Sequence, residues 1–224
     1  MIEMSQIMTT FATYYNTSTM GNSADDHIVN RIRDYKSQRL FFVDDFVDIA
    51  NYKAVSKALE RLVERNILIR VAYGIYARFN KDPLLGVLLP TTEQIAEAIA
   101  RRDKARIIPT GAYALNALGL STQIPLNVVY LTDGTPRLIK TGNRIIQFKK
   151  TTPKNLTAKG KISSLAIQAL KTIGKDKITD DERKKIQALL KKEKAEDLEH
   201  DIRLAPEWIR KIMRETLTVK ESKE

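Results

Sequence analysis

The sequence predicts an α+β chain, in which an N-terminal helical unit ending in a hairpin is followed by a mixed α/β domain with a helical C-terminal tail. Three observations lead to this fold class. Residues 55–76 read VSKALERLVERNILIRVAYGIY, so a charged amphipathic segment passes directly into two short apolar runs. Residues 91–150 alternate between helical and strand patterns. The segments after Gly174 have helical spacing.

Residues 23–82 contain three helical patterns and then two strand patterns. The first begins in DDHIVNRIRDYKSQRLFF, and VDDFVDIA is a short second helix. In the third, NYKAVSKALERLVERN, the apolar residues repeat at the spacing of one helix face: Ala54, Val55, Ala58, Leu59, Leu62 and Val63. ILIRV and GIYARF then indicate a hairpin with a turn at Gly74. Three helices followed by a hairpin are the element order of a winged helix-turn-helix.

Such a unit offers the polar face of its third helix to the DNA major groove, and its hairpin reaches the flanking backbone. The candidate DNA-binding residues are Tyr52, Lys53, Ser56, Lys57 and Arg61 on the helix and Arg70, Tyr73 and Arg78 on the hairpin. Two alternatives stay open, a merely solvated amphipathic helix and a protein-binding winged-helix adaptor. Residues 1–90 hold 11 basic and 10 acidic residues, a net charge of only +1.

Composition bounds the partners and the chemistry. The chain has 224 residues and a formal net charge of +11, which favours nucleic acid or an acidic membrane surface as a partner. It has no cysteine, which excludes disulfides, thiolate zinc sites and cysteine nucleophiles. No apolar stretch approaches the roughly 20 residues that span a bilayer, and the start lacks secretory-signal features. We expect a cytoplasmic protein without membrane contact, with residues 1–22 as a poorly ordered tail.

Residues 83–90 are predicted to be a linker that ends at Pro90, and residues 91–217 to form the second domain. RIIPT and NVVYLTDG are expected strands, and GAYALNALG is a short helix closed by Gly119. Thr179 and Glu182 have capping-box spacing at the start of a later helix. Pro206 is the expected first residue of the last helix.

A second hairpin is predicted in RLIKTGNRIIQFKK, with its turn near Gly142. Its cations have no acidic neighbours in the sequence, so they are a candidate second basic surface that adds DNA-backbone contacts: Arg137, Lys140, Arg144, Lys149 and Lys150.

The segment PTGAYALNALGLSTQIPLNVVYLTDGTPR, residues 109–137, together with the winged-helix pattern before it, resembles the abortive-infection type IV antitoxin family over about residues 26–175. The resemblance implies an N-terminal winged domain that represses its own operon by binding double-stranded promoter DNA. It also implies a second domain that counteracts a nucleotidyltransferase-like toxin without forming a stable complex. A homodimer on the DNA is left open.

The sequence predicts no catalytic, cofactor-binding or metal-binding residue. It has no phosphate-binding G-x-x-x-x-G-K-[ST] loop, and His27 and His200 do not have metal-ligand spacing. The enzymatic alternative is a metal-dependent nuclease, whose site uses clustered carboxylates beside a lysine. The acid-x-Lys triplets here are Asp34-Tyr35-Lys36, Glu182-Arg183-Lys184 and Glu221-Ser222-Lys223. The first two are expected in helices and the third in a tail, so no enzyme is expected.

Overall fold

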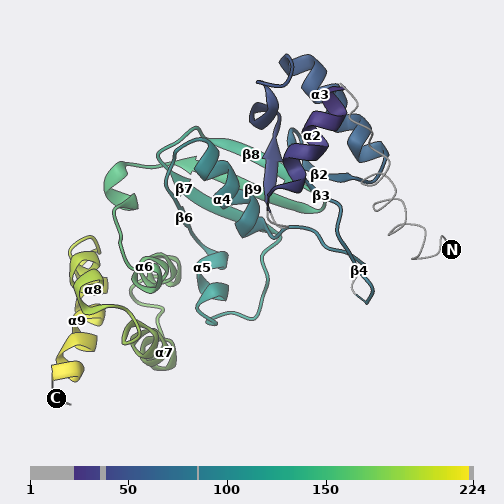
Figure 1. Ribbon diagram of the computed structural model, residues 1–224. Coiled ribbons are helices and arrows are strands. Elements are labelled where there is room, and N and C mark those ends of the chain that lie inside the picture. The colour runs from purple at the N-terminus through teal and green to yellow at the C-terminus, as the bar shows by residue number, and fades with distance from the viewer. Residues whose placement is uncertain (1–22, 36–38, 85, 222–224) are drawn as a thin grey trace. The chain divides into compact units, whose positions relative to one another are not determined.

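The computed structural model describes residues 23–35, 39–84 and 86–221. It confirms the α+β class and the helical C-terminal part. The chain divides into two units, residues 1–91 and residues 92–224 (Figure 1). The predicted tail, residues 1–22, lies outside the described residues. Within the described part, no helix combines the length and the apolar character needed to cross a membrane.

In the part of unit 1 that the structure describes, two α-helices and one turn of 3-10 helix surround an apolar core. Helix α2 (Ala24–Arg33) begins at Ser23, whose side chain accepts a hydrogen bond from the Asp26 amide. The expected second helix is the 3-10 turn η1 (Val43–Phe46). Helix α3 (Tyr52–Glu64) buries the face that its periodicity predicted, through Val55, Ala58, Leu59 and Leu62. Asn51 starts it by accepting a hydrogen bond from the Ala54 amide at 3.0 Å.

The sheet of unit 1 is antiparallel with the order β1–β3–β2. It comprises β1 (Leu40–Phe42), β2 (Leu68–Ala72) and β3 (Ile75–Arg78). The predicted hairpin is confirmed, and its turn at Tyr73–Gly74 uses glycine because φ there is 69°, which a side chain disfavours. The sequence did not predict strand β1, because its residues LFF lie at the end of the stretch that was assigned to the first helix. The second of the three helices that the winged helix-turn-helix interpretation requires is only one turn of 3-10 helix, so this interpretation remains a prediction.

A strand lies within the predicted linker, residues 83–90, and pairs with a strand at the end of the predicted winged unit. Strand β4 (Lys81–Asp82) pairs with β5 (Gly86–Val87) as a small antiparallel hairpin. The division between the units falls between Thr91 and Thr92, next to the predicted domain start at residue 91.

Unit 2 begins with helix α4 (Thr92–Arg102), which packs on a four-stranded mixed sheet (Figure 1). The strand order is β6–β7–β9–β8, with parallel pairing between β7 and β9 and antiparallel pairing elsewhere. The strands are β6 (Ile107–Pro109), β7 (Asn127–Thr132), β8 (Arg137–Thr141) and β9 (Arg144–Lys150). The expected strands and hairpin of this region are therefore confirmed.

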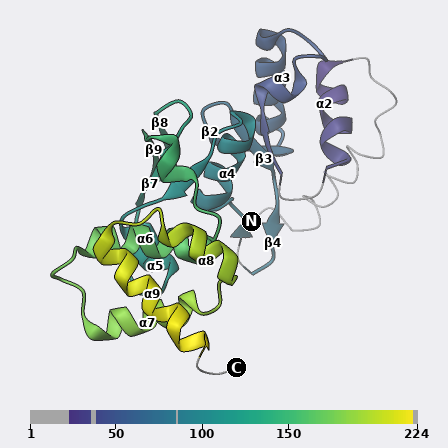
Figure 2. The ribbon, with the colours of Figure 1, turned by 90° about the vertical axis from the view of Figure 1, so that its left-hand side faces the viewer.

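An apolar core, which Leu170, Ile186 and Ile209 help to fill, is shared by the helices α5 (Ala112–Ala117), α6 (Lys161–Ile173), α7 (Asp180–Leu190), α8 (Ala195–Ile202) and α9 (Glu207–Glu221). Figure 2 shows these helices grouped together. The 3-10 turn η2 (Pro153–Leu156) precedes α6. The capping box of Thr179 and Glu182 is confirmed at the start of α7. Helix α9 starts at Glu207, one residue after the predicted Pro206.

The start of α6 is held by two carboxylates that lie far along the chain. Asp201 is fully buried and accepts hydrogen bonds from the amides of Lys159 and Gly160, each at 2.8 Å. Glu193 accepts from the amides of Ile162 and Ser163 at 2.7 and 3.1 Å. Because these carboxylates occupy the free amides at this helix start, they replace the local side-chain cap that Gly160 cannot supply.

Candidate nucleic-acid interface

The N-terminal half of α3 presents polar side chains to solvent. Tyr52 is 57% exposed, and Lys53 and Lys57 are exposed as well. Ser56 is half-buried beside them. Among the described residues, neither lysine forms an ion pair with an acidic side chain closer than 4 Å. Their ammonium groups are therefore available to an external anion.

The charge at the start of α3 differs from that at the starts of α2 and α7. The first turns of α2 and α7 carry acidic residues, which interact favourably with the positive end of the helix dipole. The first turn of α3 carries none and holds Lys53 instead. A lysine at this position adds to the positive potential of the helix end rather than offsetting it. A phosphate group near this helix end would be attracted both by the helix dipole and by the lysine ammonium.

The tip of the β2–β3 hairpin is the second exposed part of the predicted interface. Tyr73, in the turn, is 87% exposed. The Arg70 guanidinium carbon lies 5.2 Å from the centroid of the Tyr73 ring, a cation–π geometry. Arg70 is exposed, so its charge remains open to solvent while the ring restricts its orientation.

Arg61 has a partner inside unit 1. Its Nε lies 3.0 Å from a carboxylate oxygen of Asp25, which is nearly fully buried, and Arg65 reaches the same carboxylate at 3.5 Å. The hydrogen bond to Asp25 raises the pKa of Arg61. Sequence reasoning missed Asp25 as this partner, because the two residues are 36 positions apart. The guanidinium thus joins α2 to α3 and offsets a buried charge.

Arg78 also has a structural partner. Its guanidinium donates to the carbonyl oxygens of Ile32, Arg33 and Tyr35, at the end of α2. The last carbonyl groups of a helix accept no hydrogen bond from an amide of the same helix. A cation at this end also interacts favourably with the helix dipole. Arg78, at the end of β3, therefore caps the C-terminal end of α2. Its charged group is directed at the backbone carbonyls of the protein.

The pairing register divides the cations of the β8–β9 hairpin between the two faces of the sheet. Arg137 pairs with Phe148, and Lys140 pairs with Ile145. Since side chains alternate along a strand, Arg137, Arg144 and Lys150 share the face of buried Ile146 and Phe148. Lys140 and Lys149 lie on the opposite face. The sequence predicted that the five cations form one surface. This prediction is wrong, because they lie on two faces of the sheet.

Two of these five cations also interact within the protein. Arg137 forms an ion pair with Asp103, which corrects the expectation that it has no acidic neighbour. The Lys150 ammonium donates to the backbone carbonyl of Asp133 at 2.8 Å. Lys140, Arg144 and Lys149 are exposed.

The acid-x-Lys triplets of the nuclease alternative are not placed alike. Lys36, Ser222 and Lys223 fall outside the described residues. The carboxylate of Glu182 accepts hydrogen bonds from the amide and the hydroxyl of Thr179, each at 2.9 Å, as part of the α7 capping box. Within the described residues, no group of three or more histidine or acidic side chains could hold a metal ion.

Fold and surface together define an α+β protein whose first unit exposes a basic helix start and a hairpin tip. The model of one protein family, described as a family of unknown function (DUF6088), matches residues 27–198, which are 172 of the 224 residues. The chain therefore belongs to this family. A search of curated proteins found no match.

Proposed function

We propose that the protein is a DNA-binding transcriptional regulator, and that unit 1 acts as a winged helix-turn-helix. In this proposal α3 enters the major groove and the β2–β3 hairpin touches the adjacent backbone. The observation that carries the proposal is the pair of exposed lysines, Lys53 and Lys57, on the first turns of α3, where no acidic residue offsets the helix dipole. The hairpin with Arg70 and Tyr73 follows α3 directly.

The contact residues of this interface are fewer than the sequence suggested. Tyr52, Lys53, Ser56 and Lys57 on α3 and Arg70 and Tyr73 on the hairpin keep the proposed role. Arg61 and Arg78 are assigned to the stability of unit 1, because their guanidinium groups bind Asp25 and the end of α2. Substitution of either arginine would then weaken DNA binding only by destabilising unit 1.

The antitoxin role is the second part of the proposal. The resemblance of residues 109–137 to the abortive-infection type IV antitoxins supports a regulator that represses its own operon and counteracts a nucleotidyltransferase-like toxin without a stable complex. If a gene for such an enzyme lies beside this one, co-expression should relieve the growth arrest that the enzyme causes alone. Arrest that persists despite expression of the folded protein would contradict the antitoxin role while leaving DNA binding open.

An electrophoretic shift of the full chain on DNA from upstream of its own gene tests the central part. We expect a shift at protein concentrations that leave a shuffled sequence of equal length and composition unbound. Absence of any shift would reject the regulator and favour the protein-binding adaptor. Magnesium-dependent cutting of the same DNA would instead revive the nuclease alternative.

A further inference from the structure

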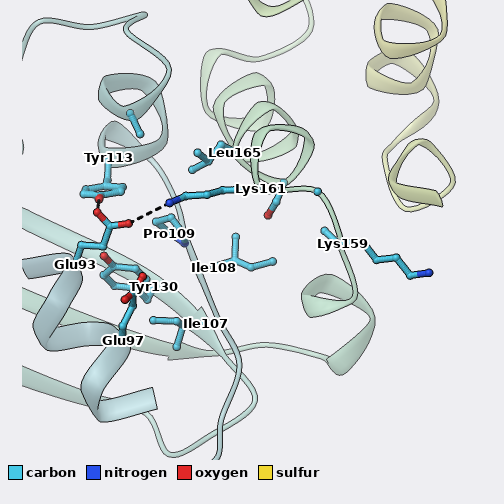
Figure 3. A pocket seen from close by; sticks show the side chains of 14 residues that line it. Glu93, Glu97, Ile107, Ile108, Pro109, Tyr113, Tyr130, Lys159, Lys161 and Leu165 are labelled. Atoms are coloured by element: carbon cyan, nitrogen blue, oxygen red, sulfur yellow. Dashed lines mark hydrogen bonds and ion pairs between the residues drawn. The ribbon is translucent and has the colours of Figure 1, made fainter. Parts of the chain in front are cut away.

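Two cavities of unit 2 border each other, and the proposed DNA contact uses neither. The larger one, of about 410 Å³, lies between α4, β6, α5 and the start of α6 (Figure 3). Its Glu93 carboxylate already accepts a hydrogen bond from the Tyr113 hydroxyl at 2.9 Å and lies 3.8 Å from the Lys161 ammonium (Figure 3). The polar groups of this cavity therefore interact with one another, and they offer little to a ligand.

The second cavity is a narrow cleft between η2 and α6, and it shares Ile108, Ala158 and Ser164 with the first. Its open volume is about 10 Å³, which is close to the space that one water molecule needs. The polar side chains that line it come from η2 and from one face of α6: Lys154, Asn155, Ser164, Gln168 and Lys171. None of the described residues that line the cleft is acidic.

Gln168 is a buried polar residue of this cleft whose side chain has no partner. It is 7% exposed. Its backbone carbonyl accepts a hydrogen bond from the Thr172 hydroxyl, but its side-chain amide makes no hydrogen bond to any described residue. The nitrogen and the oxygen of this amide both retain accessible surface, so a ligand can reach them. A buried amide without a partner is costly, and a hydrogen bond from it to a ligand would remove that cost.

Lys171 supplies the second, independent observation. It follows Gln168 by three residues, so the two side chains are neighbours on one face of α6. Although the residue as a whole is exposed, burial of its ammonium group lowers the pKa of Lys171, and no acidic group among the described residues acts in the opposite direction. An ammonium that is partly removed from water without a counter-ion is unfavourable. Lys154, which is exposed on η2, adds a second cation to the cleft.

We propose that this cleft binds a phosphate group, with one oxygen beside the Gln168 amide and the others at the rim, against Lys171 and Lys154. The donors of the cleft are two ammonium groups, the Gln168 amide and the Ser164 hydroxyl, and a phosphate offers several charged acceptor oxygens. The interior admits about one oxygen atom, so the rest of the ligand stays outside. The phosphate gives Gln168 a hydrogen-bond partner and Lys171 a counter-ion, which the described part of the chain does not supply.

The sequence around the cleft favours an anion as well. Residues 134–175 hold ten basic residues and no acidic one. Two of these cations have carboxylate partners from elsewhere in the chain, because Arg137 binds Asp103 and Lys161 lies near Glu93. Neither of these carboxylates lines the cleft, so neither competes with an anion there.

The test is calorimetric titration of the full chain with inorganic phosphate near neutral pH, at an ionic strength held constant with sodium chloride. We expect saturable binding with a Kd on the order of 1 mM, because the cleft offers two largely exposed cations and one buried donor. Since chloride is present throughout, phosphate must bind in preference to chloride to give this signal. Acetate, which has one charge and two oxygens, should bind at least about tenfold more weakly.

Three variants assign the binding to the cleft. Gln168→Leu and Lys171→Met should each raise the Kd for phosphate by roughly tenfold, because each removes a donor to a charged acceptor. Lys211→Met, at an exposed lysine on α9 outside both cavities, should leave the Kd unchanged. Without phosphate, neither cleft variant should melt at a lower temperature than the wild type, because an unpartnered amide or an uncompensated charge is replaced by an apolar group of similar size. Their weaker binding would then not reflect unfolding.

The phosphate can belong to a small phosphorylated molecule or to the backbone of a nucleic acid, and electrophoretic shifts with promoter DNA distinguish these sources. For a small molecule, Lys171→Met should bind the DNA like the wild type, and inorganic phosphate at constant ionic strength should not compete. For a nucleic-acid backbone, the substitution and the competitor should both weaken the shift. The calorimetric result does not depend on the proposed DNA binding. Absence of saturable phosphate binding, an unchanged Kd in Gln168→Leu and Lys171→Met, or equal binding of acetate would overturn the proposal.

Discussion

Helix α3 in unit 1 and the β8–β9 hairpin in unit 2 both carry exposed cations, but they present them differently. On α3, Lys53 and Lys57 are four residues apart, which places them on the same side of the helix. On β8–β9 the pairing register separates Lys140 and Lys149 from Arg144 and Lys150, which lie on the other face of the sheet.

The difference shows that the net charge of a region does not determine how its cations are arranged on the surface. Residues 91–153 hold nine basic and four acidic residues, against the +1 of residues 1–90, so charge alone favours unit 2. Yet Arg137 binds Asp103 and Lys150 binds a backbone carbonyl. Unit 1 therefore has the lower net charge, but its two exposed lysines on α3 lie on the same side of one helix.

The inward face of α3 should be the most sensitive. Leu62 is fully buried, and Leu62→Ala should lower the free energy of unfolding by about 2 to 5 kcal/mol through lost burial and the resulting cavity. Denaturant unfolding of the full chain measures this. A variant as stable as the wild type would mean that α3 does not pack in unit 1 through this face.

The paired arginines should affect stability rather than DNA contact. Arg78→Ala removes the donor to the last carbonyls of α2 and should cost roughly 1 to 3 kcal/mol. At a temperature where the variant stays folded, its affinity for promoter DNA should remain close to that of the wild type. A large loss of affinity with unchanged stability would return Arg78 to the interface.

The outward face of α3 should show the reverse pattern. Lys53→Ala combined with Lys57→Ala should leave the melting temperature unchanged, because both side chains are exposed. It should weaken promoter binding and lower the salt slope of the logarithm of the binding constant by about 2, one unit for each lost phosphate contact. Affinity measured at several salt concentrations checks this, and an unchanged slope would remove both lysines from the interface.

The matched variant in unit 2 should have the smallest effect. Lys140→Ala combined with Lys149→Ala removes the same charge from exposed positions on one face of the sheet. If α3 alone is the contact surface, promoter affinity should fall by less than about twofold at physiological salt, because charges that do not contact the DNA are largely screened beyond a Debye length of about 8 Å. A loss equal to that of the α3 variant would mean that unit 2 supplies backbone contacts.

Local patterns predicted the elements of unit 1 best where a single face or a special residue decides the structure. The buried stripe of α3 follows from apolar spacing, and the hairpin turn follows from Gly74. Strand β1 escaped prediction because its three residues are all buried and show no alternation. Its place as a strand depends on pairing with β3, which no short window of sequence contains.

The roles of individual charged residues were harder to predict, because their partners are distant in the sequence. Arg61 meets Asp25 across 36 positions, and Asp201 reaches Gly160 across 41. Tyr113 of α5 donates its hydroxyl hydrogen bond to Glu93 of α4 across 20 positions. An exposed charge in a helical pattern looks the same whether it binds a partner, closes a helix or remains in solvent.

Lysine reactivity, measured on the full chain by acetylation and mass spectrometry with and without promoter DNA, compares both regions in one experiment. We expect that Lys53 and Lys57 lose reactivity when the DNA is bound, while Lys140 and Lys149 keep theirs. Shuffled DNA at the same concentration should protect none of the four. Unchanged reactivity of Lys53 and Lys57 in a demonstrated complex would contradict the claim that α3 is the DNA-binding helix.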